Sequence, residues 1–168
     1  MSQRVFGALL VVLLAVGAGR GAAAQEEGIA VGSAAPAVVV PDLDNNPVDL
    51  GKLIGKRPVL IEFWATWCTS CQAMMPRLAA MRAEYGDTVE FIGINVTISE
   101  TREGVAAYVR EHAPPFRTLY DEAGDGARAY DPPATSFIVI VDAGGTVVYT
   151  GSGGNQNLEP ALRRVTGR

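Results

Sequence analysis

The two cysteines of this chain, Cys68 and Cys71, are separated by two residues and lie where one sequence pattern gives way to another. The residues before them, Pro58–Trp64, form an almost continuous apolar run, which is typical of a strand buried on both faces. From Cys68 to Tyr85 apolar residues recur at helical spacing, so a helix is predicted there despite Pro76. The sequence therefore places the CxxC pair between a buried strand and a helix.

The rest of the chain alternates between strand and helix patterns, which predicts one α/β domain. The other predicted elements are a hairpin over 37–50 with its turn at Asp44–Pro47, a strand over Thr88–Val96, a helix over Glu100–His112, a hairpin around Asp142–Gly145 and a last helix over 157–165. A strand–helix–strand order implies that the first two long strands are parallel. The late hairpin, at the far edge of the sheet, makes the central sheet mixed, with helices flanking it.

The N-terminus has the three-part layout of a secretory signal. Arg4 precedes an uncharged apolar run over 5–16, and small residues follow up to Ala24. We therefore expect residues 1–24 to be a cleaved signal peptide, 25–35 a tether and 36–168 the folded domain. The alternative is an uncleaved N-terminal membrane anchor, although the apolar run is short for a bilayer span.

Charge and cysteine content exclude several roles. The chain has 14 basic and 18 acidic residues, and two of the basic ones, Arg4 and Arg20, lie in the signal segment. The mature domain is therefore acidic, and no nucleic-acid partner is expected. An exported chain meets conditions in which disulfides persist, yet no cysteine lies outside the CxxC pair, so a disulfide scaffold is not expected. A zinc site would need four ligands, and only two cysteines exist.

The stretch FWATWCTSC, residues 63–71, resembles the active site of thioredoxins. The pair follows a buried strand, opens a helix and has Pro76 five positions after Cys71, and this combination is more specific than CxxC alone. With the signal segment, the N-terminal hairpin and an extra segment between Val96 and Phe116, the chain resembles exported TlpA/ResA-type thiol-disulfide oxidoreductases. The resemblance implies a thioredoxin-like fold with an N-terminal β-hairpin and an inserted segment between the second core strand and the C-terminal half.

In such a site the helix N-terminus gives the two thiols different roles. Its unpaired N–H groups and partial positive charge favour a thiolate at Cys68, which is expected to be the nucleophile. Cys71, one turn further on, is expected to be shielded and to resolve the mixed disulfide. Trp67 would cover the pair and contact substrate, whereas Trp64 would lie in the core with its N–H bonded. No cofactor beyond the dithiol is expected.

Glu62 is an acid within the apolar strand, six residues before Cys68, and burial would raise its pKa. It falls where thioredoxins carry a buried aspartate that exchanges a proton with the resolving cysteine, which implies the same catalytic task for Glu62. The alternative is that strand alternation or a bulge turns Glu62 to water. Many ResA-like proteins have a glutamate three positions after the second cysteine, and Met74 stands there in this chain.

The segment YDPPATSF, residues 130–137, lies where thioredoxin-like proteins have a cis-proline loop against the redox pair. The resemblance assigns Pro133 as the cis residue and makes Pro132, Pro133 and Thr135 substrate-binding; two trans prolines are the alternative. Because Pro132 has no N–H, one main-chain hydrogen bond to substrate would be missing.

Two other functions stay open. Peroxiredoxins share the fold but need a threonine three residues before the reactive cysteine; Ala65 stands there, and Thr66 is one residue away. Met74 and Met75, with His112 as a further candidate, are ligands that a copper chaperone could use, although methionines at helical spacing usually pack in a core or form a docking surface and a histidine there caps its helix.

The resemblance implies a periplasmic or otherwise extracytoplasmic monomer that exchanges disulfides with protein substrates. A reductant is expected, because Thr69-Ser70 lacks the histidine that strongly oxidising relatives have there; a disulfide-forming oxidant is the alternative. The implied pathway is cytochrome c maturation or copper-site assembly, with apocytochrome c or a copper-site protein as substrate. The implied electron donor is a membrane protein of the CcdA or DsbD type.

Overall fold

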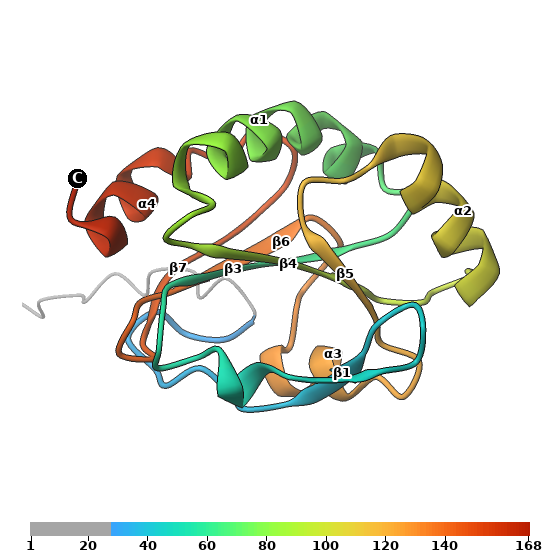
Figure 1. Ribbon diagram of the computed structural model, residues 1–168, viewed down its shortest axis with the longest axis horizontal. Coiled ribbons are helices and arrows are strands. Elements are labelled where there is room, and N and C mark those ends of the chain that lie inside the picture. The colour runs from blue at the N-terminus through green and yellow to red at the C-terminus, as the bar shows by residue number, and fades with distance from the viewer. Residues whose placement is uncertain (1–27) are drawn as a thin grey trace, which may run out of the picture.

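Five strands form one mixed sheet at the centre of the computed structural model, which describes residues 28–168 (Figure 1). The strands are β3 (Val59–Trp64), β4 (Glu90–Asn95), β5 (Arg117–Tyr120), β6 (Phe137–Val141) and β7 (Val147–Ser152), in the spatial order β5-β4-β3-β6-β7. β3 pairs in parallel with β4, and β4 with β5, whereas β6 is antiparallel to both β3 and β7. The predicted parallel pair and the late hairpin are confirmed.

Helices cover one face of this sheet, and a smaller layer covers the other. In Figure 1, α1 (Thr69–Tyr85), α2 (Arg102–His112) and α4 (Glu159–Thr166) lie above the sheet. Below it lie α3 (Asp125–Tyr130), the hairpin of β1 (Val39–Pro41) and β2 (Pro47–Asp49), and the short 3-10 helix η1 (Leu50–Lys52). The predicted N-terminal hairpin and thioredoxin-like layers are therefore present.

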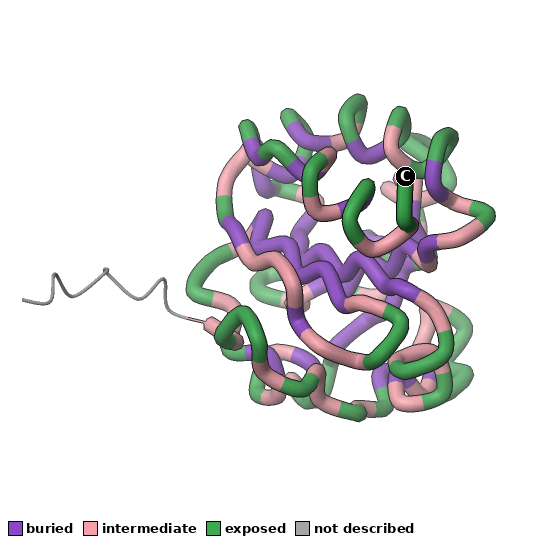
Figure 2. The backbone as a smooth tube through the Cα atoms, turned by 90° about the vertical axis from the view of Figure 1, so that its left-hand side faces the viewer, coloured by how far each residue is buried: buried purple, intermediate pink, exposed green. Residues whose placement is uncertain are grey.

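Strand alternation divides the core between the two faces of the sheet. Every residue of β3 is buried, and the purple band in Figure 2 follows the sheet through the middle of the molecule. On the helical face Leu60 and Trp64 pack with α1, while on the opposite face Ile61 and Phe63 pack with the N-terminal hairpin and Tyr130. Burial on both sides explains the apolar run that precedes the cysteines.

The sequence did not predict α3, a six-residue helix between β5 and β6. Its N-terminal amides are bonded from outside the helix, since the buried Asp121 carboxylate accepts hydrogen bonds from Gly126 and Ala127 at 3.1 and 2.8 Å. This tertiary hydrogen bonding stabilises a helix too short for a clear periodic signal.

The described part of the predicted tether, residues 28–35, is packed on the domain. Gly32 N–H donates to Val147 O and Val147 N–H donates to Ser33 O, at the start of β7. Ile29 N–H donates to Tyr130 O, and Ala35 N–H donates to Gly145 O. Ile29 and Ala35 also pack against the core. These eight residues therefore extend the folded domain, and the predicted signal peptide, residues 1–24, lies outside the described residues. Within residues 28–168, no helix is long and apolar enough to cross a membrane.

Candidate active site

Cys68 and Cys71 form a disulfide at the N-terminus of α1, with their Cα atoms 5.2 Å apart. Cys68 is the N-cap residue, and its Sγ accepts a hydrogen bond from Cys71 N–H at 3.0 Å. Cys68 remains 4% exposed, whereas Cys71 is fully buried. The helix end can therefore stabilise negative charge on Cys68, and a substrate meets Cys68 before Cys71.

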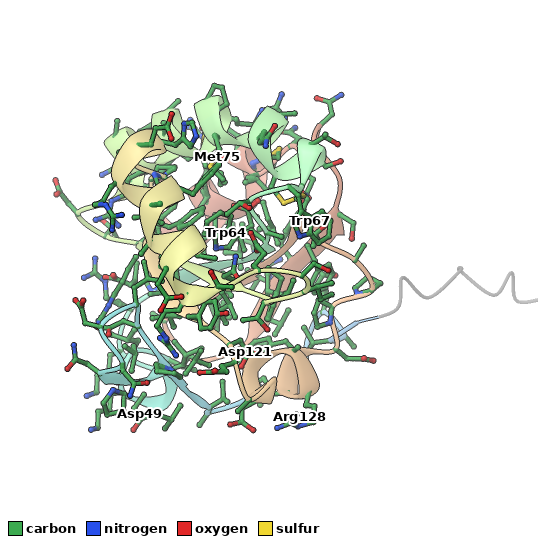
Figure 3. The ribbon with its side chains drawn as sticks, turned by 90° about the vertical axis from the view of Figure 1, so that its right-hand side faces the viewer. Asp49, Trp64, Trp67, Met75, Asp121 and Arg128 are labelled. Carbon is green, nitrogen blue, oxygen red and sulfur yellow. A yellow bond between two sulfur atoms is a disulfide. The ribbon has the colours of Figure 1, made fainter. Side chains whose placement is uncertain are left out.

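An exposed apolar surface lies beside the disulfide. Trp67 is 49% exposed and lies next to the yellow disulfide in Figure 3. Its indole N–H donates to Ile98 O at 2.9 Å, and the Ile98 side chain is 59% exposed. Large exposed apolar side chains next to a reactive group are typical of a site that binds polypeptide.

A pocket of about 330 Å³ continues this surface toward the proline segment. It is lined by Val96, Ile98, Ala127 and the four residues Pro132–Thr135. Three of the four residues predicted to bind substrate, Pro132, Pro133 and Thr135, thus line one pocket with Ile98, and the carbonyl of Ile98 accepts a hydrogen bond from the fourth, Trp67. Their contact with substrate stays a prediction.

The predicted cis bond before Pro133 is wrong. No peptide bond within residues 28–168 is cis, so the two prolines are joined by a trans bond. The residue directly before β6 is instead Ser136, which has a left-handed φ of 61° and donates its main-chain N–H to Phe63 O at 2.8 Å. Because a missing main-chain hydrogen bond from Pro132 to substrate was expected only with a cis bond before Pro133, that expectation does not hold.

Ser136 is held by the loop that follows β7. Buried Gln156 donates from Nε2 to Ser136 O at 2.9 Å and to Gly153 O at 2.8 Å. In the same loop Gly154 lies against α1: a Cβ added there would be 3.1 Å from Ser70 O. The glycines of TGSGGNQ therefore allow a close approach between this loop and the start of the active-site helix.

Glu62 is buried within β3 on the same face as Leu60 and Trp64, which pack in one cluster with Cys71. The alternative, in which Glu62 faces water, is therefore excluded. Its carboxylate oxygens have no hydrogen-bond partner among the described residues, because its neighbours across the sheet are Gly93 and Ile138. Burial raises the pKa of Glu62 to about 8, so the carboxyl is mostly protonated at neutral pH.

Trp64 lies in the core, as predicted, between the rings of Tyr108 and Phe116 at 5.6 and 5.4 Å. Its indole N–H, expected to be bonded, has no partner among the described residues. Burial, and secondarily the nearby Glu62 carboxylate, raise the pKa of Tyr108. Tyr108 is therefore the polar side chain from α2 that lies near the buried acid.

The three candidate copper ligands do not all lie together. Met74 is fully buried in the core, whereas Met75 and His112 border an open groove between α1 and α2 with Tyr108. The His112 ring packs against Tyr108 in a tilted arrangement, with the centroids 4.2 Å apart. Among the described residues, no three His, Cys, Asp or Glu side chains are grouped as metal ligands.

Comparison with known proteins agrees with this fold and site. The model of the Redoxin family matches residues 30–165. The thiol-disulfide oxidoreductase ResA of Bacillus thuringiensis is 30% identical over 145 residues, covering 84% of this chain and 82% of that protein. Two solved structures, each 25% identical, are also similar. The thioredoxin domain of a thiol-disulfide oxidoreductase from Bacteroides vulgatus has a TM-score of 0.69 over 82% of this chain and 99% of that one, and a secreted disulfide oxidoreductase of Mycobacterium tuberculosis has 0.65 over 78% and 96%.

The chain belongs to the Redoxin family. Within that family it is a thioredoxin-like thiol-disulfide oxidoreductase of the TlpA/ResA type, with a CxxC pair that forms a disulfide.

Three residues near the cysteine pair were not predicted from the sequence. Glu100 accepts hydrogen bonds from Thr66, Asn95 also donates to Glu100, and Ile98 holds Trp67. They lie in one short segment that runs from the last residue of β4, Asn95, into the loop that follows it, but nothing in their spacing indicates that this segment folds against residues 65–67.

Proposed function

We propose that this protein reduces disulfides in protein substrates outside the cytoplasm. The observation that carries the proposal is the redox pair itself: a disulfide at a helix N-terminus that exposes the edge of Cys68 and buries Cys71. In the reduced protein, the Cys68 thiolate attacks a substrate disulfide and forms a mixed disulfide. Cys71 then attacks Cys68 and releases the reduced substrate, which regenerates the Cys68–Cys71 bond.

The proposed direction rests on the residues around the nucleophile. Thr69 and Ser70 supply no cation to stabilise the reduced form further, as the histidine of strong oxidants does. We expect the reduced protein to turn over insulin disulfides, and an equilibrium titration against a dithiol buffer to give a potential well below the oxidising end near −120 mV. A potential near that value would make the protein a disulfide-forming oxidant.

The signal-like N-terminus supports export, and one of the similar structures is described as a secreted disulfide oxidoreductase. A reductant there needs electrons from across the membrane, since the periplasm has no thiol buffer to supply them. A membrane donor of the CcdA or DsbD type would fill this role. The proposed substrates are apocytochrome c or a copper-site protein, and the apolar surface around Trp67 and Ile98 suits an unfolded segment that carries cysteine.

Glu62 is proposed to take the proton from Cys71 as the mixed disulfide is resolved. Its pKa of about 8 is close to that of a free thiol, which is favourable for proton transfer between them. Glu62→Gln should slow resolution of the mixed disulfide several-fold at pH 8, and the rate of release should no longer increase with pH. Alkylation of Cys68, which needs no proton transfer to Glu62, should keep its wild-type rate.

Stopped-flow measurement of release from a model disulfide peptide tests this prediction. The matched control is Glu90→Gln, which changes the same side chain at the start of β4, where it pairs with Arg57. Release that is unaltered in Glu62→Gln would show that Glu62 takes no part in resolution.

A further inference from the structure

The residues that lead from β3 to Cys68 are held by a loop that follows β4. Thr66 N–H donates to Glu100 Oε1 at 3.0 Å, and the Thr66 hydroxyl donates to the same oxygen. Asn95 Nδ2 donates to the other oxygen, Oε2, at 2.7 Å. Beside this contact, Trp67 donates to Ile98 O in the same loop. Both residues that precede Cys68 are thus bonded to residues 95–100.

Three donors face the side chain of residue 100, so both of its side-chain oxygens must act as hydrogen-bond acceptors. Asn95 is fully buried, and its Oδ1 accepts from Thr97 N–H at 2.9 Å, so its amide NH₂ is the group that faces Glu100. Thr66 presents a main-chain N–H, which can only donate. A carboxylate satisfies both neighbours, whereas a side-chain amide would place its own NH₂ against one of them.

Glu100 is itself fixed by its surroundings. The Tyr120 hydroxyl donates to Glu100 O at 3.2 Å, and Glu100 N–H donates to Thr97 O at 3.3 Å. Thr97 and Ser99 have left-handed φ values of 60° and 56°, which non-glycine residues adopt only where their surroundings impose it. The loop is therefore held in one conformation, and the Glu100 carboxylate is the group through which the loop binds the segment before Cys68.

We propose that Glu100 is a positioning residue for thiol-disulfide exchange: its carboxylate fixes Thr66, and with it the placement of Trp67 and Cys68 at the mouth of α1. The inference rests on the proposed exchange function and adds to it a group that touches neither sulfur. Glu100 acts through Thr66 on the geometry in which Cys68 meets a substrate disulfide.

The test replaces Glu100 with glutamine, which keeps the size of the side chain but turns one acceptor into a donor. We expect kcat/KM for a model disulfide peptide to fall about tenfold, a change that corresponds to about 1.4 kcal/mol. The fluorescence emission of Trp67 should shift as its hydrogen bond to Ile98 loosens. The variant Trp67→Phe separates that emission from the emission of Trp64. Glu103→Gln, which alters an exposed glutamate in the first turn of α2, should leave both readouts unchanged.

The reciprocal variant Asn95→Asp with Glu100→Gln separates positioning from a general loss of stability. In the double variant, the residue 100 amide can donate to the new carboxylate and still accept from Thr66, so exchange and Trp67 emission should both recover. Asn95→Asp alone brings two carboxylates together and should be the most impaired of the three.

The inference would be overturned if Glu100→Gln kept the wild-type rate of exchange and the wild-type Trp67 emission. It would also be overturned if the reciprocal variant failed to recover the exchange activity that Glu100→Gln had lost. Lower thermal stability with both readouts unchanged would show a structural role only and would equally contradict it. If the wild type itself fails to exchange disulfides, the proposed function fails, and positioning is then tested by Trp67 emission and by the alkylation rate of Cys68 across the same variants.

Discussion

Replacing Cys68 with serine should abolish thiol-disulfide exchange, whereas replacing Cys71 with serine should trap a mixed disulfide between Cys68 and the substrate. The reason is the unequal exposure of the pair: Cys68, the N-cap residue of α1, is 4% exposed, whereas Cys71 is fully buried. Without Cys68 no thiol reaches a substrate, so insulin reduction should fall at least about a thousandfold, to the rate of the buffer thiol.

Mass spectrometry of each variant after reaction with a disulfide peptide checks the assignment. Cys71→Ser should carry one peptide in disulfide linkage, and Cys68→Ser should carry none. Ser70→Ala keeps both thiols and serves as the control, which should turn over without accumulating the adduct. Equal adduct in both cysteine variants would mean that the nucleophile and the resolving thiol are not distinguished by position on the helix.

The second large effect concerns stability and comes from Glu62. Burial without a partner raises the pKa of its carboxyl from an ordinary value of 4.5 to about 8 in the folded protein. Between these two values the folded state holds a proton that the unfolded state has released. The free energy of unfolding should therefore fall as pH rises from about 4.5 to about 8 and be constant, with respect to this group, above that range.

Denaturant unfolding of the oxidised protein at pH 5 and pH 9 measures this effect, since the disulfide keeps both thiols from titrating. Each pKa unit corresponds to about 1.4 kcal/mol, so ionisation of Glu62 should lower the free energy of unfolding of the wild type by several kcal/mol at pH 9. Glu62→Gln, which cannot ionise, should match the wild type near pH 5 and exceed its stability by several kcal/mol at pH 9.

Glu90→Gln is again the control, because Glu90 is partly exposed and its carboxylate lies 3.5 Å from Arg57 Nη1. Its unfolding free energy should follow the wild-type pH dependence. A constant difference between Glu62→Gln and the wild type from pH 5 to pH 9 would show that Glu62 ionises in the folded state as it does in the unfolded chain.

Local sequence patterns were sufficient to predict the centre of this protein. The apolar run ending at Trp64 and the helical spacing that starts at Cys68 depend on the residues themselves, since burial on both faces selects apolar side chains and a helix repeats every 3.6 residues. The placement of the CxxC pair at the helix mouth follows from those two patterns. Turn residues such as Asp142–Gly145 located the late hairpin in the same way.

The surroundings of the pair were decided by tertiary structure. Within residues 28–168 Glu62 has no hydrogen-bond partner, because the register of the sheet brings Gly93 and Ile138 beside it, and that register is fixed by the packing of the whole core. Glu100 reaches Thr66 because two loops at the same edge of the sheet meet, which no local spacing reveals. The sequence by itself determined where the two thiols lie; the neighbours that set their proton transfer and positioning come from distant segments, which only the folded chain brings together.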